Sequence, residues 1–221
     1  MIRQRKRRMD MKRKFIALAG ALLMMLCPLT ACGDNGGDVS EADLPYGATL
    51  ISSSDLPVQV RYDHRFVEEP LAKQISAFYH AVQEQDTAAY SKLLFPLYHN
   101  YEMDVVYKDR YTEADMLKMI HDSYEEDFGK EFDFSLIDVV SLTVRDGQST
   151  VRDALNLMLQ QLAADEGDKN FVNDLQALYE LSNDCYLCDR GSGKTGDTVS
   201  VTKGSQLFAA KYKNQWYLIY T

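Results

Sequence analysis

The stretch ISAFYHAVQEQDTAAYSKLL, residues 75–94, decides the fold of this chain of 221 residues. Its apolar side chains, with one from the preceding turn, recur at helical spacing: Leu71, Ile75, Phe78, Tyr79 and Val82. Asp86 is a good N-cap, so a second, shorter helix is expected to begin there and to end near Pro96. The folded part of the chain therefore opens with a long helix and a short one.

A third helix and a long strand are expected next. Thr112 and Asp115 form a capping-box pattern, and Gly129 is expected to end the helix that begins there. Apolar residues then alternate over residues 132–144, which predicts a strand with a kink or bulge near Asp138.

The remaining sequence predicts two more helices and then strands. The helices lie within residues 150–182, on either side of Gly167-Asp168. The strands are expected at Cys185–Asp189, Thr198–Lys203, Gln206–Tyr212 and Trp216–Thr221, the last two forming a hairpin over Lys213-Asn214-Gln215. Helices followed by a meander of strands indicate an α+β domain, with the helices on one face of an antiparallel sheet.

Two segments carry a resemblance to the nuclear-transport-factor-2-like (cystatin-like cone) superfamily. The pair Gln85-Asp86, between a long helix and a short one with paired leucines, resembles the opening of that superfamily. The ending LFAAKYKNQWYLIY, residues 207–220, is similar to its closing hairpin. The resemblance implies a curved, cone-like sheet with a pocket, and it allows a homodimer. The two helices at about 150–182 depart from the pattern and would be an insertion.

The N-terminus predicts export and lipid anchoring. Leu29-Thr30-Ala31-Cys32 follows a basic segment and an apolar one, and it resembles the lipobox of bacterial lipoproteins. The apolar run from Phe15 to Leu29 is shorter than the roughly 20 residues of a transmembrane helix and suits a signal peptide. Residues 1–31 are therefore expected to be removed and Cys32 lipidated, whether translation starts at Met1 or at Met11.

Charge and composition restrict the partners. Residues 1–31 hold eight of the 24 basic and one of the 33 acidic residues, so the mature chain has a net charge of −16. Such a chain is repelled by nucleic acid, and the lipid on Cys32 must hold it to the membrane, facing outside the cytoplasm. Residues 32–57 are poor in large apolar residues and predict a flexible linker, which leaves residues 58–221 as a single domain.

Asp138 is the strongest candidate for chemistry. A carboxylate among the apolar residues of a strand could act as a general acid or base, with His121 as a weaker candidate. Enzymes of the superfamily that the chain resembles use tyrosines inside the cone, which makes Tyr79, Tyr98 and Tyr101 pocket candidates. Trp216 is expected to pack against the sheet or the helices, and it is a further pocket candidate if it is exposed. The alternative is that Asp138 marks a bulge and faces water.

Cys185 and Cys188 are three residues apart in an exported chain. They can form a local disulfide, remain buried thiols, or serve a metal or redox site, although side chains three apart on a straight strand point to opposite faces. The four histidines belong to no metal-binding motif, and the acidic run around Asp122 to Asp133 is typical of a solvated face. No metal site and no cofactor are therefore predicted.

Two functions remain open at this point. In the first, the chain is a membrane-tethered lipoprotein whose non-catalytic domain binds a small ligand or a protein. In the second, it is a small cone-fold enzyme of the isomerase, dehydratase or hydrolase type that uses Asp138. The lack of a second catalytic partner favours the first.

Overall fold

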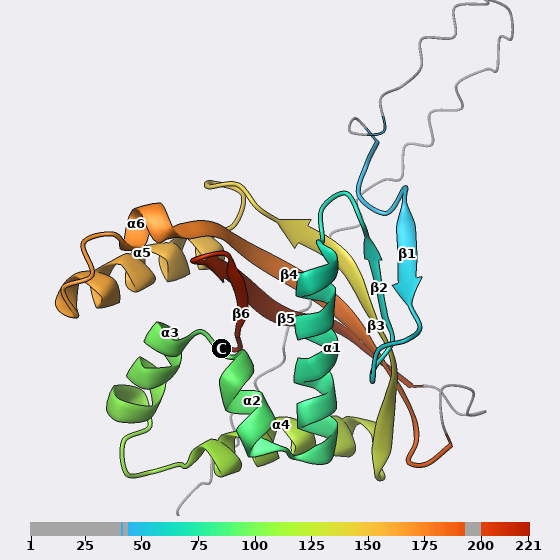
Figure 1. Cartoon of the computed structure of the whole chain (residues 1–221). Helices are drawn as coiled ribbons and strands as arrows, with labels where there is room; N and C mark the ends of the chain where they lie inside the picture. Colours follow the sequence, from blue (N-terminus) through green and yellow to red (C-terminus); the bar gives the residue numbers. More distant parts are fainter. Residues whose placement is uncertain (1–40, 42–43, 193–199) are drawn as a thin grey trace, which may run out of the picture. The chain divides into compact units, whose positions relative to one another are not determined.

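The computed structural model describes residue 41, residues 44–192 and residues 200–221. Within this part of the chain, six strands form one sheet whose neighbours follow chain order (Figure 1). The strands are β1 (Leu50–Ser53), β2 (Val60–Asp63), β3 (Phe132–Thr143), β4 (Leu175–Asp189), β5 (Ser200–Tyr212) and β6 (Gln215–Ile219). The helical segments are α1 (Glu69–Glu84), α2 (Thr87–Leu93), α3 (Pro96–Tyr101), the π-helical η2 (Glu102–Val106), α4 (Glu113–Phe128), α5 (Thr150–Asp165) and α6 (Phe171–Asp174). The domain is α+β, as predicted.

The predicted helices α1, α2 and α4 form with the expected caps. Asp86 accepts a hydrogen bond from the backbone of Ala89 at the start of α2. Thr112 and Asp115 form the capping box of α4, and Gly129 ends that helix with a φ of 84°. The apolar stripe of α1 is fully buried against the sheet in the main core. These local signals therefore place the helical layer over one face of the sheet, where Figure 1 shows α1 crossing the strands.

The sheet is mixed, which corrects the prediction of an antiparallel sheet. β2 runs parallel to β3, through the pairs Val60–Ile137 and Arg61–Asp138. All other neighbouring strands are antiparallel. β3 carries two register shifts, between Phe134 and Leu136 and between Val139 and Ser141, so the predicted irregularity near Asp138 is present on both sides of it.

The other face of the sheet is covered at one end by α5. A second core cluster joins Leu155 and Leu159 of this helix to Phe208 and Ala210 of β5. Leu207 and Ala209 belong to the main core, and successive side chains of a strand point to opposite faces. The prediction that all helices lie on one face is therefore wrong for α5.

The predicted two-helix insertion is one helix and a single helical turn. α5 forms as expected, but α6 ends at Asp174, and Leu175 begins the strand β4. β5 is likewise one long strand, with Gly204 at a φ of 69° near the point where a break was expected. Residues 198–199 of that predicted strand lie outside the described part of the chain. Long strands pair along their whole length here, and this pairing overrides the local pattern.

The hairpin between β5 and β6 forms as predicted, but its turn has two residues and not three, because Gln215 already belongs to β6. Lys213 and Asn214 both have positive φ, 50° and 66°, and Tyr212 pairs with Gln215. Positive φ at both central residues defines the two-residue turn whose twist matches that of paired strands. This turn fixes the register of the last strand.

The ordered domain begins earlier than the predicted boundary at residue 58. β1 pairs with β2, and the buried carboxylate of Asp63 accepts hydrogen bonds from Gly47, Thr49 and Arg65. The Arg65 guanidinium also donates to the carbonyl oxygen of Leu44, 3.0 Å away. The predicted flexible linker is therefore wrong for residues 44–57, where an ion pair and a hairpin order a polar segment.

Candidate functional site

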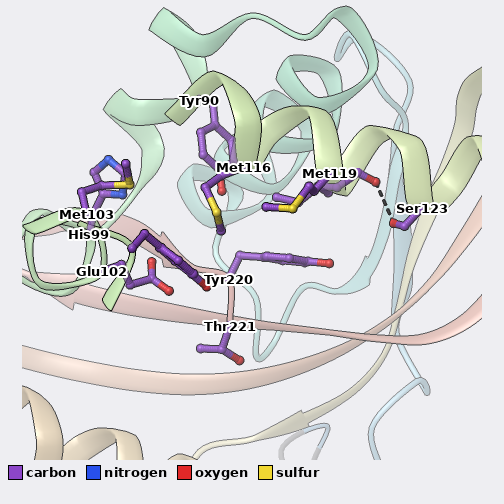
Figure 2. A pocket seen from close by; sticks show the side chains of 11 residues that line it. Tyr90, His99, Glu102, Met103, Met116, Met119, Ser123, Tyr220 and Thr221 are labelled. Carbon is purple, nitrogen blue, oxygen red and sulfur yellow. Dashed lines mark hydrogen bonds between the residues drawn. The ribbon is translucent and has the colours of Figure 1, made fainter. Parts of the chain in front are cut away.

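A cavity of about 240 Å³ lies between α2, η2, α4 and the residues after β6. We call it the Met–Tyr cavity, and its lining consists of Tyr90, His99, Glu102, Met103, Tyr107, Met116, Met119, Ile120, Ser123, Tyr220 and Thr221. In Figure 2, Met116 and Met119 approach from the helix on one side, and Tyr220 lies across from them. Most of the lining is apolar or aromatic, so the cavity suits a ligand with an apolar body.

The π-helical segment η2 brings a carboxylate to this cavity. The backbone of Tyr107 donates to the carbonyl of Glu102 over 2.7 Å, which widens the helix by one residue relative to an α-turn. Figure 2 shows Glu102 and His99 at one end of the cavity and Ser123 at the other. The lining is therefore polar at its ends and apolar between them.

Glu102 is half-buried, and this changes its chemistry. Burial raises the pKa of its carboxyl group to about 7, while a hydrogen bond from Tyr98 acts in the opposite direction. Burial also raises the pKa of the Tyr90 hydroxyl, which faces the same cavity. Near neutral pH, Glu102 can thus exchange between a neutral hydrogen-bond donor and an anion.

A second polar group, beside the cavity, ties three helices together. Glu113 of α4 is 2.8 Å from His99 Nε2 and accepts a hydrogen bond from the Ser91 hydroxyl. The carboxylate lies between the hydroxyl and the imidazole. A nucleophile–base pair needs direct contact between those two groups. This group is therefore a link between α2, α3 and α4.

None of the four predicted pocket residues lines the Met–Tyr cavity. Tyr79 is fully buried in the main core, where its ring meets Phe134 edge to face at 5.0 Å. Trp216 packs on Tyr179 in the same core, and Tyr101 lines a separate groove beside α5. Tyr98 contributes only through its hydrogen bond to Glu102. The tyrosines that line the cavity are Tyr90, Tyr107 and Tyr220.

Asp138 is held in an ion pair. Both of its carboxylate oxygens accept hydrogen bonds from Arg61 on the neighbouring strand, one from Nε at 2.9 Å. Ile137 and Val139, on either side of it, point into the main core, so Asp138 points to the opposite face of the sheet. Asp138 does not line the Met–Tyr cavity, and both of its carboxylate oxygens are already occupied by the Arg61 guanidinium.

His121 and the two cysteines are buried. His121 stacks on Phe132 with ring centroids 5.1 Å apart, on the helical side of the sheet. No disulfide joins Cys185 to Cys188. Their side chains lie on opposite faces of β4, where Cys185 belongs to the main core and Cys188 Sγ donates to the carbonyl of Asp133. Because the strand is straight between the two cysteines, their sulfur atoms point away from each other and cannot form a disulfide.

The predicted lipidation site Cys32 lies outside the described residues. Among the helices that the structure does describe, none has the length and apolar character needed to span a membrane. Comparison of the chain with protein-family models, with curated proteins and with solved structures finds no match.

Glu102 should make stability depend on pH. Its folded pKa, about 7, lies above the ordinary value of 4.5. The folded state therefore favours the protonated form, a contribution fully present below pH 4.5 and lost as the pH rises through about 7. Glu102→Gln should remove this dependence, so its advantage over the parent in free energy of unfolding should be larger at pH 8 than at pH 5.

Urea unfolding of both proteins at the two pH values measures this difference. Glu126→Gln on the exposed side of α4 is the matched control and should show no such change between pH 5 and pH 8. An advantage of Glu102→Gln that is the same at both pH values would mean that Glu102 is ionised throughout.

Proposed function

We propose that this chain is a bacterial lipoprotein, anchored outside the cytoplasm by lipid on Cys32, whose domain binds a small amphipathic ligand without transforming it. The observation that carries the binding proposal is the Met–Tyr cavity, with its apolar middle and the half-buried Glu102 at one end. The anchoring rests on the lipobox-like sequence at residues 29–32.

The lining of the cavity supports an amphipathic ligand. Methionine side chains are flexible and polarisable, so Met103, Met116 and Met119 can adapt to an apolar body. The apolar character continues outside, because Met119 is 43% exposed and Tyr111, whose ring meets that of Tyr107 edge to face, is 44% exposed. Glu102 would interact with a polar or cationic group of the ligand at the cavity end.

The cone-like form of the sheet is also a proposal. One support is the order of elements, in which the long α1 and the short α2, capped at Asp86, lie over long antiparallel strands. Another is the set of register shifts in β3 and β4, because such shifts bend the strands that contain them. The parallel pair β2–β3 and the helix α5 on the second face are additions to the expected pattern. The homodimer is likewise a proposal that rests on the family resemblance alone.

The enzyme alternative has less support. Asp138, its proposed base, is paired with Arg61 and points away from the helical side of the sheet. The Ser91–Glu113–His99 group has the carboxylate in the centre. A binding domain with a titratable carboxylate is the function that these contacts support best.

Photocrosslinking in the native host separates the two functions. We expect a photoreactive residue at position 119 to capture the ligand, because Met119 lies at the mouth of the cavity. Met116→Trp fills the cavity and should abolish capture, whereas Asp138→Asn keeps the side-chain shape and should change capture less than about twofold. Leu157→Trp on the exposed side of α5 is the matched control for added bulk.

Surface abundance must be matched between these variants, since removing half of the Arg61–Asp138 pair also affects stability. Loss of host function in Asp138→Asn at unchanged abundance and melting temperature would favour the enzyme instead. A catalytic general base contributes about 10²–10⁴-fold in rate, so such a loss would be large.

A further inference from the structure

His121 has a buried nitrogen that no described group satisfies. Its side chain is only 8% exposed, and its Nδ1 is buried with no hydrogen-bond partner in the part of the chain that the structure describes. The imidazole ring packs against the ring of Phe132, with the two centroids 5.1 Å apart. Buried polar atoms are nearly always paired, so an unpaired imidazole nitrogen needs an explanation, and an unseen ion is one of the usual ones.

Two carboxylates converge on this nitrogen. Asp122 Oδ1 is 3.7 Å from Nδ1, and Glu125 Oε2 is 3.9 Å from it. These three atoms all lie within 4.8 Å of one another. Both separations are too long for hydrogen bonds. Three ligands bound to one ion at about 2.0–2.2 Å would lie roughly 3.0–3.5 Å apart, so a small rotation of each carboxylate completes the site.

The carboxylates are able to make that movement. Asp122 is 49% and Glu125 41% exposed, whereas the imidazole is held rigidly in the core. Lys118 Nζ pairs with Asp122 Oδ2 at 2.6 Å on the exposed side of this group. An exposed pair of this kind is weak, so a divalent ion can replace the ammonium.

We propose that His121, Asp122 and Glu125 form a binding site for a divalent transition-metal ion of the zinc type. Calcium and magnesium take oxygen ligands, whereas one imidazole nitrogen with two carboxylates suits zinc and its neighbours. Three ligands from one helical turn leave a coordination position open to water. The site borders a solvent-open hollow that Glu84, Glu131 and Arg190 also line, which gives the ion a path of entry.

The surrounding charge favours a cation. The last turn of α4 contains no basic residue, while Glu125, Glu126 and Asp127 are acidic. Carboxylates near a helix C-terminus oppose the helix dipole, and a bound cation relieves this repulsion. Arg190, the nearby guanidinium, is already paired with Glu84 at 3.0 Å.

Zinc titration of the full chain in detergent tests the site. A chromogenic chelator in competition gives the affinity of each protein for Zn²⁺. We expect His121→Phe, which keeps an aromatic ring on Phe132, and Glu125→Gln to weaken binding at least about tenfold, since even supporting groups of metal sites contribute 10–100-fold. Glu126→Gln and His80→Gln, both exposed and outside the site, should change it less than twofold.

Two further readouts separate this site from other sources of binding. Zn²⁺ should raise the melting temperature of the parent and of Glu126→Gln equally, and at the same concentration should raise that of Glu125→Gln less. Co²⁺ in place of zinc should give visible bands without the thiolate charge-transfer band that cysteine ligands produce. Equal zinc affinity in the parent and Glu125→Gln, a thiolate band, or tighter binding of Ca²⁺ than of Zn²⁺ would each overturn the proposal. If His121→Phe fails to fold, Glu125→Gln alone still decides.

Discussion

Trp216→Ala is expected to lower the free energy of unfolding by about 3–5 kcal/mol, the usual cost of removing a large aromatic side chain from a core. Trp216 is 3% exposed, and its ring lies 5.2 Å from that of Tyr179. Its Nε1 donates to Glu68, 3.1 Å away, and Lys211 bonds to the same carboxylate. The residue therefore ties the start of α1 to the last hairpin of the sheet.

Urea denaturation of Trp216→Phe separates the contribution of ring packing from that of the hydrogen bond to Glu68. Phenylalanine keeps most of the packing and loses the hydrogen bond to Glu68, so it should cost about 1–2 kcal/mol. For a domain of this size the alanine variant should melt at least about 6 °C below the parent. An alanine variant that melts within a degree or two of the parent would place Trp216 on a mobile surface and contradict the packing described above.

Cys32→Ala should abolish lipidation and block cleavage before residue 32. In the proposed lipoprotein the lipid would be attached to the sulfur of Cys32, and alanine at this position has no sulfur to carry it. The uncleaved apolar segment from Phe15 to Leu29 would still associate with membranes, so localisation alone is an insufficient readout. Labelling with a fatty-acid analogue and the mass of the N-terminal peptide measure the change directly.

Cys27→Ala is the matched control, because this cysteine lies within the apolar segment and outside the lipobox. It should be processed and labelled as in the parent. Normal processing and labelling of Cys32→Ala would remove the lipoprotein proposal while leaving the binding proposal for the domain untouched.

Features that depend on local chemistry could be predicted from the sequence. The stripe of α1, the cap at Asp86 and the capping box at Thr112 each involve residues within two turns of one another. The turn at Lys213-Asn214 is similarly local. Such signals need no knowledge of distant partners, and they placed three helices and the last hairpin correctly.

Features that depend on distant pairing could not be predicted in the same way. Leu175, Leu178 and Tyr179 have the spacing of a helix, yet they lie in β4 between β3 and β5. A register shift between Leu175 and Ala177 also breaks the alternation that would have indicated a strand. β1 was missed because it is a largely exposed edge strand, and its polar composition resembles that of a linker.

The candidate site was missed for a related reason. Glu102 lies in a π-helical turn that has no simple sequence signature, and its burial depends on elements far away in the chain. The available signal was Met116 with Met119, one helical turn apart on α4. Asp138 was predicted as a candidate because it is a carboxylate among apolar residues. Its ion-pair partner Arg61 lies on β2, a strand that was not predicted, so the pairing could not be foreseen.

Native mass spectrometry of the full chain, extracted from host membranes in mild detergent, tests the binding claim most directly. We predict a non-covalent mass on the parent and on Leu157→Trp, released on unfolding and missing from Met116→Trp. The same bound mass on Met116→Trp would show that the Met–Tyr cavity is not the binding site. No bound mass on any of the three proteins, at matched folding and extraction, would contradict the proposal that this domain binds a small ligand.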